Sequence, residues 1–513
     1  MRTFSDKITA PGEPGTAPST EPGPPPPTPR HAAALLPWGW AAVLFALYAT
    51  VAVRRHLLLR TTGYDLGIFE QAIRAYAELR APVVPLRGEG FNLLGDHFHP
   101  ALAALAPLYR LWPSPLCLLL AQSALLALAV VPLARWAARS LGRAAAHAIA
   151  LAYGLSWGIA SAAAFDFHEV ALAVPLLSYA AVAFGERRWG AAVAWAAPLV
   201  LIKEDLGLTL AALGLLIAWK GPRRLGLITA ACGLLASAVE IRLLLPAFNP
   251  AGGYAHGDNL GEAAHTSLLT TLAFAPLDAL RPDVKALTLV LVFAPAALLA
   301  VRSPLALLAV PTLAWRMLSQ NAFHWGTSFH YSAVLMPIVI AGLIDVLTRW
   351  RGTDPAPDPS VVRQVRASLA TALAVTVVLL PSFPLAQLAQ RATWRTTPHV
   401  TAAHALLDRI PDGATVAASN RLAPQLTARC EVVLFPTFPV ESRLYEYDKD
   451  QLPRPTAEWI VHDRHAPGAW PYRTGHWPYP PERQRTELET AIRSYGYERV
   501  AERDGITLLR RTD

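Results

Sequence analysis

Long apolar runs recur along most of this chain, with short polar stretches between them. A run of about twenty apolar residues matches the hydrocarbon core of a bilayer when it forms a helix. Several runs here are shorter, so we expect short or tilted helices among them. The pattern predicts an α-helical polytopic membrane protein with about eleven transmembrane helices, near residues 32–53, 114–133, 144–164, 170–184, 190–202, 206–219, 225–245, 286–301, 304–318, 331–347 and 367–385.

The polar parts of the chain divide it further. Residues 1–31 contain the tract "EPGPPPPTPR" and no apolar periodicity, which predicts a disordered cytoplasmic tail. Within the predicted transmembrane domain, residues 32–390, the first outer loop at 54–113 is too long for a simple connector. Residues 391–513 alternate between strand-like and helix-like segments, so we expect a small extracytoplasmic α/β domain there.

Composition and charge agree with a membrane protein. Of the 513 residues, 53% are hydrophobic and only 16% are charged, which is too apolar for an ordinary soluble chain. The net charge of +8 comes from basic residues between apolar runs, a positive-inside pattern that argues against a nucleic-acid partner. It predicts a membrane protein with a cytoplasmic N-terminus and an external C-terminal domain. Arg54, Arg55 and Arg60 break the pattern and are candidates for an anionic ligand or lipid head group.

The same topology brings polar groups from distant segments to the outer face. Ionisable groups at the ends of membrane segments usually face a cavity or a partner, which predicts one outward-facing polar site. Each group could instead cap a helix or extend to the interface. The residues are Asp65, Glu70, Asp96, His97, His99, Asp166, His168, Glu169, Lys203, Glu204, Asp205, His324 and His330.

The first outer loop contains two candidate motifs. Its segment "GYDLGIFEQAIRAYAEL" has apolar residues at helical spacing, which predicts an amphipathic helix along the membrane interface. Asp65 at its start could cap this helix or act as a general base at the surface. The block "GDHFHP" adds Asp96, His97 and His99, and aspartate with histidine can bind a divalent cation.

Further motifs lie in later segments. In "KED", Lys203 could contact a phosphate beside a metal or acceptor contact from Glu204 or Asp205, or the three could form an internal ion pair. Arg316 could hold a leaving phosphate or extend to the interface. In the C-terminal region Asn420 lies near a predicted strand end, where it could touch an acceptor or form a turn. The cysteines, Cys117, Cys232 and Cys430, do not suggest a disulfide framework.

The blocks "YDLGIFEQ", "LGDHFHP", "FDFHE" and "KED", in this order between apolar runs, resemble an uncharacterised bacterial family of multi-pass membrane proteins of unknown function. That family is grouped with the GT-C superfamily of membrane glycosyltransferases. The likeness extends from about Leu35 to the end of the chain and is more specific for the family than for a reaction.

The resemblance implies transfer of a sugar from a polyprenyl-phosphate donor to a cell-envelope acceptor outside the membrane. Its catalytic carboxylate maps to Asp65, although an acidic pair in the first loop is not evident here. The substrate-binding candidates are Glu70, Arg54, Lys203, Glu204, Arg316 and His330. A divalent metal, Mg or Mn, would be held by Asp96, His97, His99, His168 and Glu169. A transporter and a non-catalytic membrane sensor or scaffold remain as alternatives.

Overall fold

A computed structural model describes residues 30–250, 252–254, 256–257, 280–354, 356–436, 452, 454–471 and 475–512, with side chains from residue 35. The predicted tail before Arg30 lies outside these residues. Residues 37–513 form one compact unit, and the description below concerns this unit.

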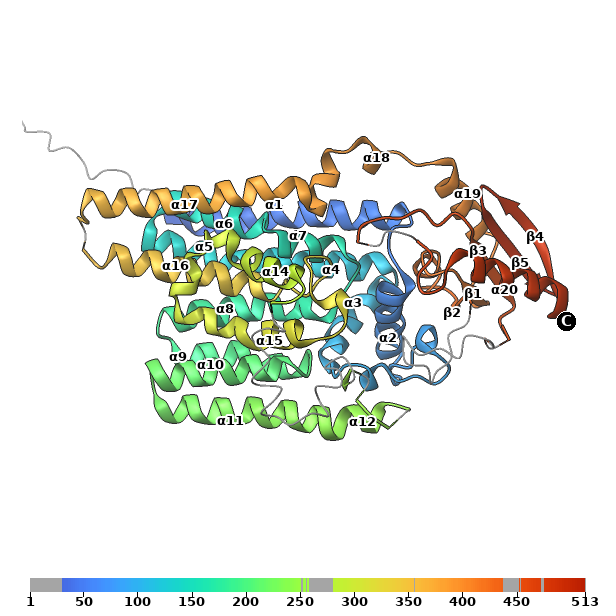
Figure 1. Cartoon of the computed structure of the whole chain (residues 1–513), viewed down its shortest axis with the longest axis horizontal. Helices are drawn as coiled ribbons and strands as arrows, with labels where there is room; N and C mark the ends of the chain where they lie inside the picture. Colours follow the sequence, from blue (N-terminus) through green and yellow to red (C-terminus); the bar gives the residue numbers. More distant parts are fainter. Residues whose placement is uncertain are drawn as a thin grey trace, which may run out of the picture. The chain divides into compact units, whose positions relative to one another are not determined.

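Helices make up most of this unit, and every predicted apolar segment overlaps one, so the predicted helical membrane fold is confirmed. The long helices run roughly parallel to one another (Figure 1). They are α1 (Arg30–Leu57), α4 (Pro115–Leu128), α5 (Val130–Leu141), α6 (Arg143–Gly154), α7 (Trp157–Ala164), α8 (Ala173–Gly185), α9 (Trp189–Ala196), α10 (Leu206–Lys220), α11 (Arg223–Val239), α12 (Leu245–Phe248), α14 (Asp283–Phe293), α15 (Val310–Leu318), α16 (Leu335–Arg351) and α17 (Pro359–Leu379).

Only some of these helices can cross a bilayer by length alone. Among the described residues, 4 continuous helical stretches are long and apolar enough: Leu35–Leu57, Pro115–Leu141, Arg223–Phe248 and Pro359–Ser382. The stretches around α8, α9, α10 and α15 are apolar but shorter. Glycine allows the short helix α10 to pack tightly on α11, because a methyl group on Gly214 or Gly226 would collide with the facing backbone. Helices α10 and α11 therefore form a close helical hairpin, and the short spans predicted on either side of "KED" correspond to α9 and α10.

The C-terminal part contains the predicted α/β domain. Its helices are α18 (Arg391–Trp394), α19 (Pro398–Leu407) and α20 (Pro481–Ser494). Its strands are β1 (Thr415–Ala418), β2 (Glu431–Leu434), β3 (Trp459–Asp463), β4 (Tyr497–Arg503) and β5 (Ile506–Arg511), in the order β2-β1-β3-β5-β4. Strand β1 is parallel to β2 and β3, while β5 is antiparallel to β3 and to β4, its partner in the predicted hairpin.

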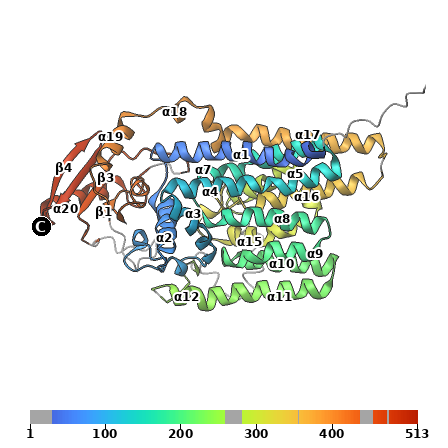
Figure 2. The ribbon, with the colours of Figure 1, turned by 180° about the vertical axis from the view of Figure 1, so that it is seen from behind.

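The first loop and the C-terminal sheet share one hydrophobic core. The loop helices are α2 (Ile68–Ala77) and α3 (Ala106–Leu111). Leu66 and Ile73 belong to the same buried cluster as Val416 of β1 and Val461 of β3. Helix α2 lies between the membrane helices and the sheet in both views (Figures 1 and 2).

This arrangement corrects the prediction of an amphipathic helix with one exposed face. Most residues of α2 are buried, including the polar Glu70 and Gln71. Gln71 Nε2 donates to Val432 O of β2 at 2.8 Å, so even its polar side faces protein. Glu70 and Gln71 are hydrogen-bonded both to the C-terminal domain and to other parts of the first loop, as is usual for buried polar groups.

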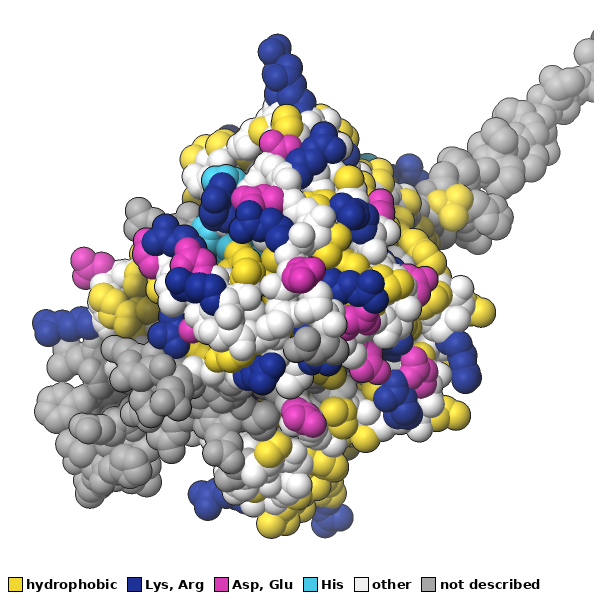
Figure 3. Space-filling model, turned by 90° about the vertical axis from the view of Figure 1, so that its right-hand side faces the viewer, with side chains coloured by type: hydrophobic (Ala, Val, Ile, Leu, Met, Phe, Trp, Pro, Cys, Tyr) yellow, Lys and Arg dark blue, Asp and Glu magenta, His cyan; other side chains and the backbone are white. Residues whose placement is uncertain are grey.

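The surface of the molecule differs between its end and its flanks. At the end formed by the C-terminal domain, Lys and Arg side chains are interspersed with Asp and Glu (Figure 3). Large apolar side chains are exposed instead on the membrane helices, including Ile228 and Leu235 of α11 and Val378 of α17. This contrast fits apolar flanks in lipid and a polar end in water.

Candidate functional site

The Asp65 turn opens the first loop. Asp65 lies in a π-helical turn, Gly63–Gly67, that leads directly into α2. Thr62 Oγ1 lies 3.2 Å from Asp65 Oδ2 and 2.6 Å from Asp166 Oδ2, and the Thr62 amide donates to the same Asp166 oxygen at 2.8 Å. The first loop and the "FDFHE" block are therefore joined through Thr62, as the shared outer face predicted.

Asp65 is the more accessible carboxylate of this pair. Its side chain is 20% exposed, whereas Asp166 is buried. Burial and the negative charge of Asp166 raise the pKa of Asp65 well above its usual range, against the hydrogen bond from Thr62. A carboxyl group with a raised pKa at the edge of a buried cluster is suited to exchange protons with a ligand.

A row of charged and aromatic groups continues from Asp65 into the helical bundle. His168 Nε2 lies 3.6 Å from Asp65 Oδ1, and Lys203 Nζ lies 3.0 Å from Glu169 Oε1. The ring of His330 stacks on that of His168 with centroids 3.5 Å apart. We call these residues, Asp65, Asp166, His168, Glu169, Lys203 and His330, the Asp65 cluster. It contains members of four segments that are distant in sequence.

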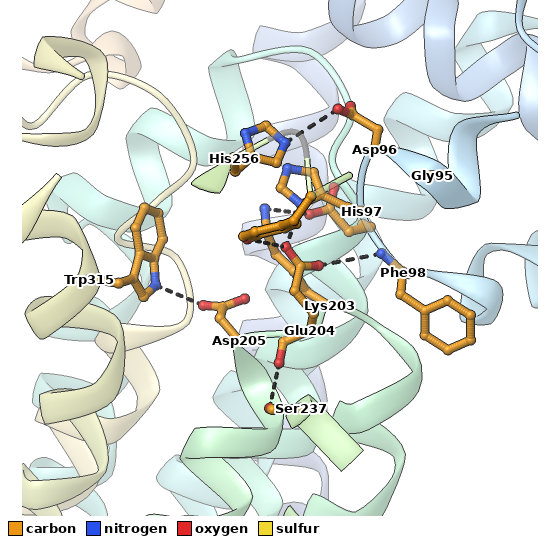
Figure 4. A network of polar contacts seen from close by, with 12 residues as sticks. Gly95, Asp96, His97, Phe98, Lys203, Glu204, Asp205, Ser237, His256 and Trp315 are labelled. Atoms are coloured by element: carbon orange, nitrogen blue, oxygen red, sulfur yellow. Dashed lines mark hydrogen bonds and ion pairs between the residues drawn. The ribbon is translucent and has the colours of Figure 1, made fainter. Parts of the chain in front are cut away.

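A small cavity borders the Asp65 cluster. It is lined by Lys203 and His330 from the cluster, together with Asp205, Trp315 and Tyr331. Trp315 Nε1 donates to Asp205 Oδ2 at 2.8 Å, which fixes this carboxylate at the wall of the cavity (Figure 4). Lys203 is therefore paired with Glu169 and also borders a small cavity whose lining is mostly apolar.

A second group, the Asp96 cluster, lies around Glu204 of "KED" (Figure 4). It consists of Asp96, His97, Glu204, His256 and Arg87. His97 Nδ1 lies 2.7 Å from Glu204 Oε1, Arg87 Nη2 lies 2.8 Å from Asp96 Oδ1, and His256 Nε2 lies 3.3 Å from the same Asp96 oxygen. The rings of His97 and His256 stack with centroids 4.2 Å apart.

Electrostatics favours the charged forms of Asp96 and His97, whereas burial lowers the pKa of His256. Burial opposes the negative charge of Asp96, but Arg87 and the histidines outweigh it and hold the pKa of Asp96 well below its usual range. Likewise, burial opposes the charged form of His97, but the Glu204 carboxylate outweighs it and raises the pKa of His97. Asp96 is therefore present as an acceptor-only carboxylate that can bind a cation.

Only some of the predicted metal ligands lie together in the structure. Ligand atoms of Asp96, His97 and His256 all lie within 4.8 Å of one another. The predicted ligands His168 and Glu169 belong instead to the Asp65 cluster, where Glu169 pairs with Lys203. The predicted ligand His99 is buried against Phe69, with ring centroids 5.8 Å apart. The prediction that all five ligands form one contiguous metal site is therefore wrong. The structure groups two of them, Asp96 and His97, with His256.

Three predicted substrate-binding residues have other contacts. Glu70 accepts a hydrogen bond from Tyr109 OH at 2.9 Å and another from Thr427, so it ties α2 to the C-terminal domain. Arg54 Nε donates to Thr393 O of α18 at 2.9 Å. These contacts give both residues a structural role, and their predicted part in substrate binding stays a prediction.

Arg316 is the third of these residues. It is 0% exposed, and it donates to His324 O at 3.0 Å, Ser332 Oγ at 2.9 Å and Gly326 O at 2.9 Å. Its guanidinium therefore organises the loop that leads to His330. Burial rules out the predicted extension to the interface, and a contact with a phosphate stays a prediction.

The sequence did not assign His256 and Arg87 to the Asp96 cluster, or Asn420 to the Asp65 turn. His256 lies in a segment without a recognisable motif, about 160 positions after His97, and no spacing could have connected the two. Asn420 follows β1 and contacts the Asp65 turn. Its position at a strand end was the one available signal.

A solved structure has a similar fold. ArnT from Cupriavidus metallidurans in the apo state is similar with a TM-score of 0.51, over 93% of this chain and 97% of that chain, at 13% sequence identity. Such identity shows the fold alone.

The family is shown more directly. The model of the family described as "Predicted membrane protein (DUF2079)" matches residues 55–508, and the chain belongs to this family. The match covers every block that carried the resemblance. No curated protein matches the chain significantly.

Proposed function

We propose that this protein is a membrane glycosyltransferase that moves a sugar from a polyprenyl-phosphate donor to a hydroxyl group of a cell-envelope acceptor. The observation that carries the proposal is the placement of Asp65. It is a partly exposed carboxyl group with a raised pKa, and it borders a buried cluster that contains a lysine. The GT-C-like fold supports the choice of a lipid-linked sugar as donor.

The chemistry requires a base and a positive charge. Asp65 removes the proton of the acceptor hydroxyl while the acceptor oxygen bonds to the anomeric carbon of the sugar. The bond from this carbon to the phosphate oxygen breaks, and the electron pair leaves with the polyprenyl phosphate. Lys203 lines the adjacent cavity and faces the charge that develops on the phosphate. The apolar flanks leave the lipid tail in hydrocarbon.

Release of the lipid phosphate tests this function. Purified protein in lipid nanodiscs is incubated with a panel of polyprenyl-phosphate sugars, with and without an envelope extract as acceptor. We expect the wild-type protein to release polyprenyl phosphate from at least one donor and to transfer its sugar to the extract. Absence of release from every donor, for protein that is folded, contradicts the proposal and favours a scaffold or transporter.

We also propose that the Asp96 cluster binds a divalent metal. Its donors would be the Asp96 carboxylate and ring nitrogens of His97 and His256. Imidazole nitrogens favour Mn²⁺ or another first-row transition ion over Mg²⁺, which prefers oxygen ligands. When bound, the ion would supply positive charge next to the "KED" segment.

Metal binding can be measured without turnover. His256→Ala is expected to lower the affinity for Mn²⁺ by more than about tenfold, because it removes one of the three donors. The measurement is isothermal titration of metal-free protein with MnCl₂. His147→Ala, a histidine paired with Trp40 on the bundle, is the matched control. Equal affinity for Mn²⁺ in wild type, His256→Ala and His147→Ala would show that the metal binds elsewhere, and absence of binding in all three would show that the protein has no such site.

The sidedness of the reaction rests on the charge pattern of the loops. We propose that the C-terminal domain and both clusters lie outside the cytoplasm. Asp412 has an 81% exposed side chain and pairs with Arg429, so Asp412→Cys should cost less than about 1 kcal/mol. In a background with Cys430→Ala, this cysteine is expected to react with an impermeant thiol reagent in spheroplasts. Protection until lysis would reverse the proposed orientation.

A further inference from the structure

We propose that the C-terminal α/β domain positions the general base, and that Asn420 is the positioning residue. This inference rests on the proposed function of Asp65. It assigns to the domain a role in the reaction that does not require contact with donor or acceptor.

The first argument is the place of Asn420 in the sheet. Strand β1 lies between its parallel neighbours β2 and β3, so its carboxyl end is in the middle of the parallel part of the sheet. In open α/β sheets, ligands bind at this carboxyl edge. Ser419 and Asn420 occupy it here, next to Asp463 at the end of β3, whose amide donates to Ser419 Oγ at 3.1 Å.

The second argument is what fills this edge. Asn420 is buried, and its carbonyl oxygen accepts a hydrogen bond from Gly63 N at 2.6 Å. Its side-chain Oδ1 accepts a second bond from Tyr64 N at 2.9 Å. Both donors directly precede Asp65. The edge that holds a ligand in other α/β domains therefore holds the Asp65 turn in this one.

The third argument is the closeness of the contact. A methyl group on Gly63 would lie 2.7 Å from Cβ of Ala423 and 3.3 Å from Asn420 O. Real Cβ atoms essentially never approach another atom as closely as the first distance, and the second is tight, so the turn touches the domain without room for a side chain. Trp477 adds a ring contact with Tyr64, at 4.7 Å between centroids. The backbone on which Asp65 stands is thus fixed on one side by the C-terminal domain.

A misplaced base lowers the rate of the chemical step more than it lowers binding, because a displacement of about 1 Å can cost about 100-fold. Asn420→Ala removes the acceptor of Tyr64 N and is expected to lower kcat by at least about tenfold, with an unchanged KM for the donor. Gly63→Ala displaces the same turn by collision and is expected to have the same effect. Thr397→Ala, which removes a cap of α19 in the same domain, is the matched control and should leave kcat unchanged.

Asn420→Asp separates positioning from simple stability. Aspartate keeps the acceptor for Tyr64 N but adds a negative charge beside Asp65, which raises the pKa of Asp65 further. Since the base acts when it is deprotonated, the ascending limb of the kcat profile is expected to move to higher pH while the maximal kcat stays close to that of wild type. A role in folding alone would lower the melting temperature without moving this limb.

Hydrogen exchange makes the test independent of turnover. The peptide containing Tyr64 is expected to exchange at least about tenfold faster in Asn420→Ala than in Thr397→Ala or wild type. Unchanged exchange and unchanged kcat in Asn420→Ala would overturn the positioning role. If the wild-type protein transfers no sugar while Asn420→Ala still accelerates exchange, the proposed function fails and the structural coupling of domain and turn stands.

Discussion

Replacing Asp65 by asparagine is expected to reduce sugar transfer by about 10² to 10⁴-fold, the largest loss of activity from any single exchange in this protein. Asparagine preserves the size of the side chain and still accepts a hydrogen bond from Thr62, but it cannot remove a proton from the acceptor. Turnover is measured as release of polyprenyl phosphate, and donor affinity is measured on the same preparation. The affinity for the donor should stay within about threefold of wild type, because the donor binds before the base acts.

Asp166→Asn is the matched control for this exchange. Asp166 shares Thr62 with Asp65, and its negative charge contributes to the raised pKa of Asp65. Loss of that charge lowers the pKa of Asp65, so the ascending limb of the rate profile moves to lower pH and transfer persists. If Asp65→Asn transfers sugar at the wild-type rate, Asp65 has no part in the reaction, and the proposed mechanism is wrong.

The sequence predicted the parts of this protein that depend on short-range pattern. Apolar runs located the helices because a membrane helix must satisfy its backbone internally and present apolar side chains to lipid. Alternating loop charges indicated which polar blocks share a face, and the structure joins Asp65 with Asp166 and Lys203 with Glu169. Both results follow from rules that act within one segment or between its ends.

The remaining features depend on contacts between distant segments. Helix α2 has an amphipathic pattern, and a single sequence cannot show that its polar side faces β2, since Gln71 and its partner Val432 are 361 residues apart. The same holds for Glu70, which was assigned to a substrate because its tertiary partners, Tyr109 and Thr427, carry no motif. The sequence alone could not show which ionisable residues form the Asp65 cluster and which form the Asp96 cluster. That division depends on which side chains pair with each other in the folded protein.

The Lys203–Glu169 pair makes the largest expected contribution to stability among the proposed site residues. Lys203 is 7% and Glu169 is 1% exposed, and their charged atoms are 3.0 Å apart. Removing one partner of such a pair leaves the other charge buried without its counter-ion. Lys203→Met is therefore expected to lower the free energy of unfolding by about 3–5 kcal/mol, measured by thermal or denaturant unfolding in a mild detergent.

The double variant Lys203→Met/Glu169→Leu distinguishes stability from function. Apolar residues of similar volume can replace a buried ion pair without a net loss of stability, so we expect the double variant to regain most of what Lys203→Met loses. Transfer should stay low in both variants, because neither has the positive charge that faces the donor phosphate. A stable double variant with wild-type transfer would show that Lys203 only neutralises the charge of Glu169 and has no part in the reaction. Equal stability of Lys203→Met and wild type would show instead that water reaches the pair. In either case the positive charge for the leaving phosphate would have to come from another group, and a metal at Asp96, His97 and His256 would be the next candidate.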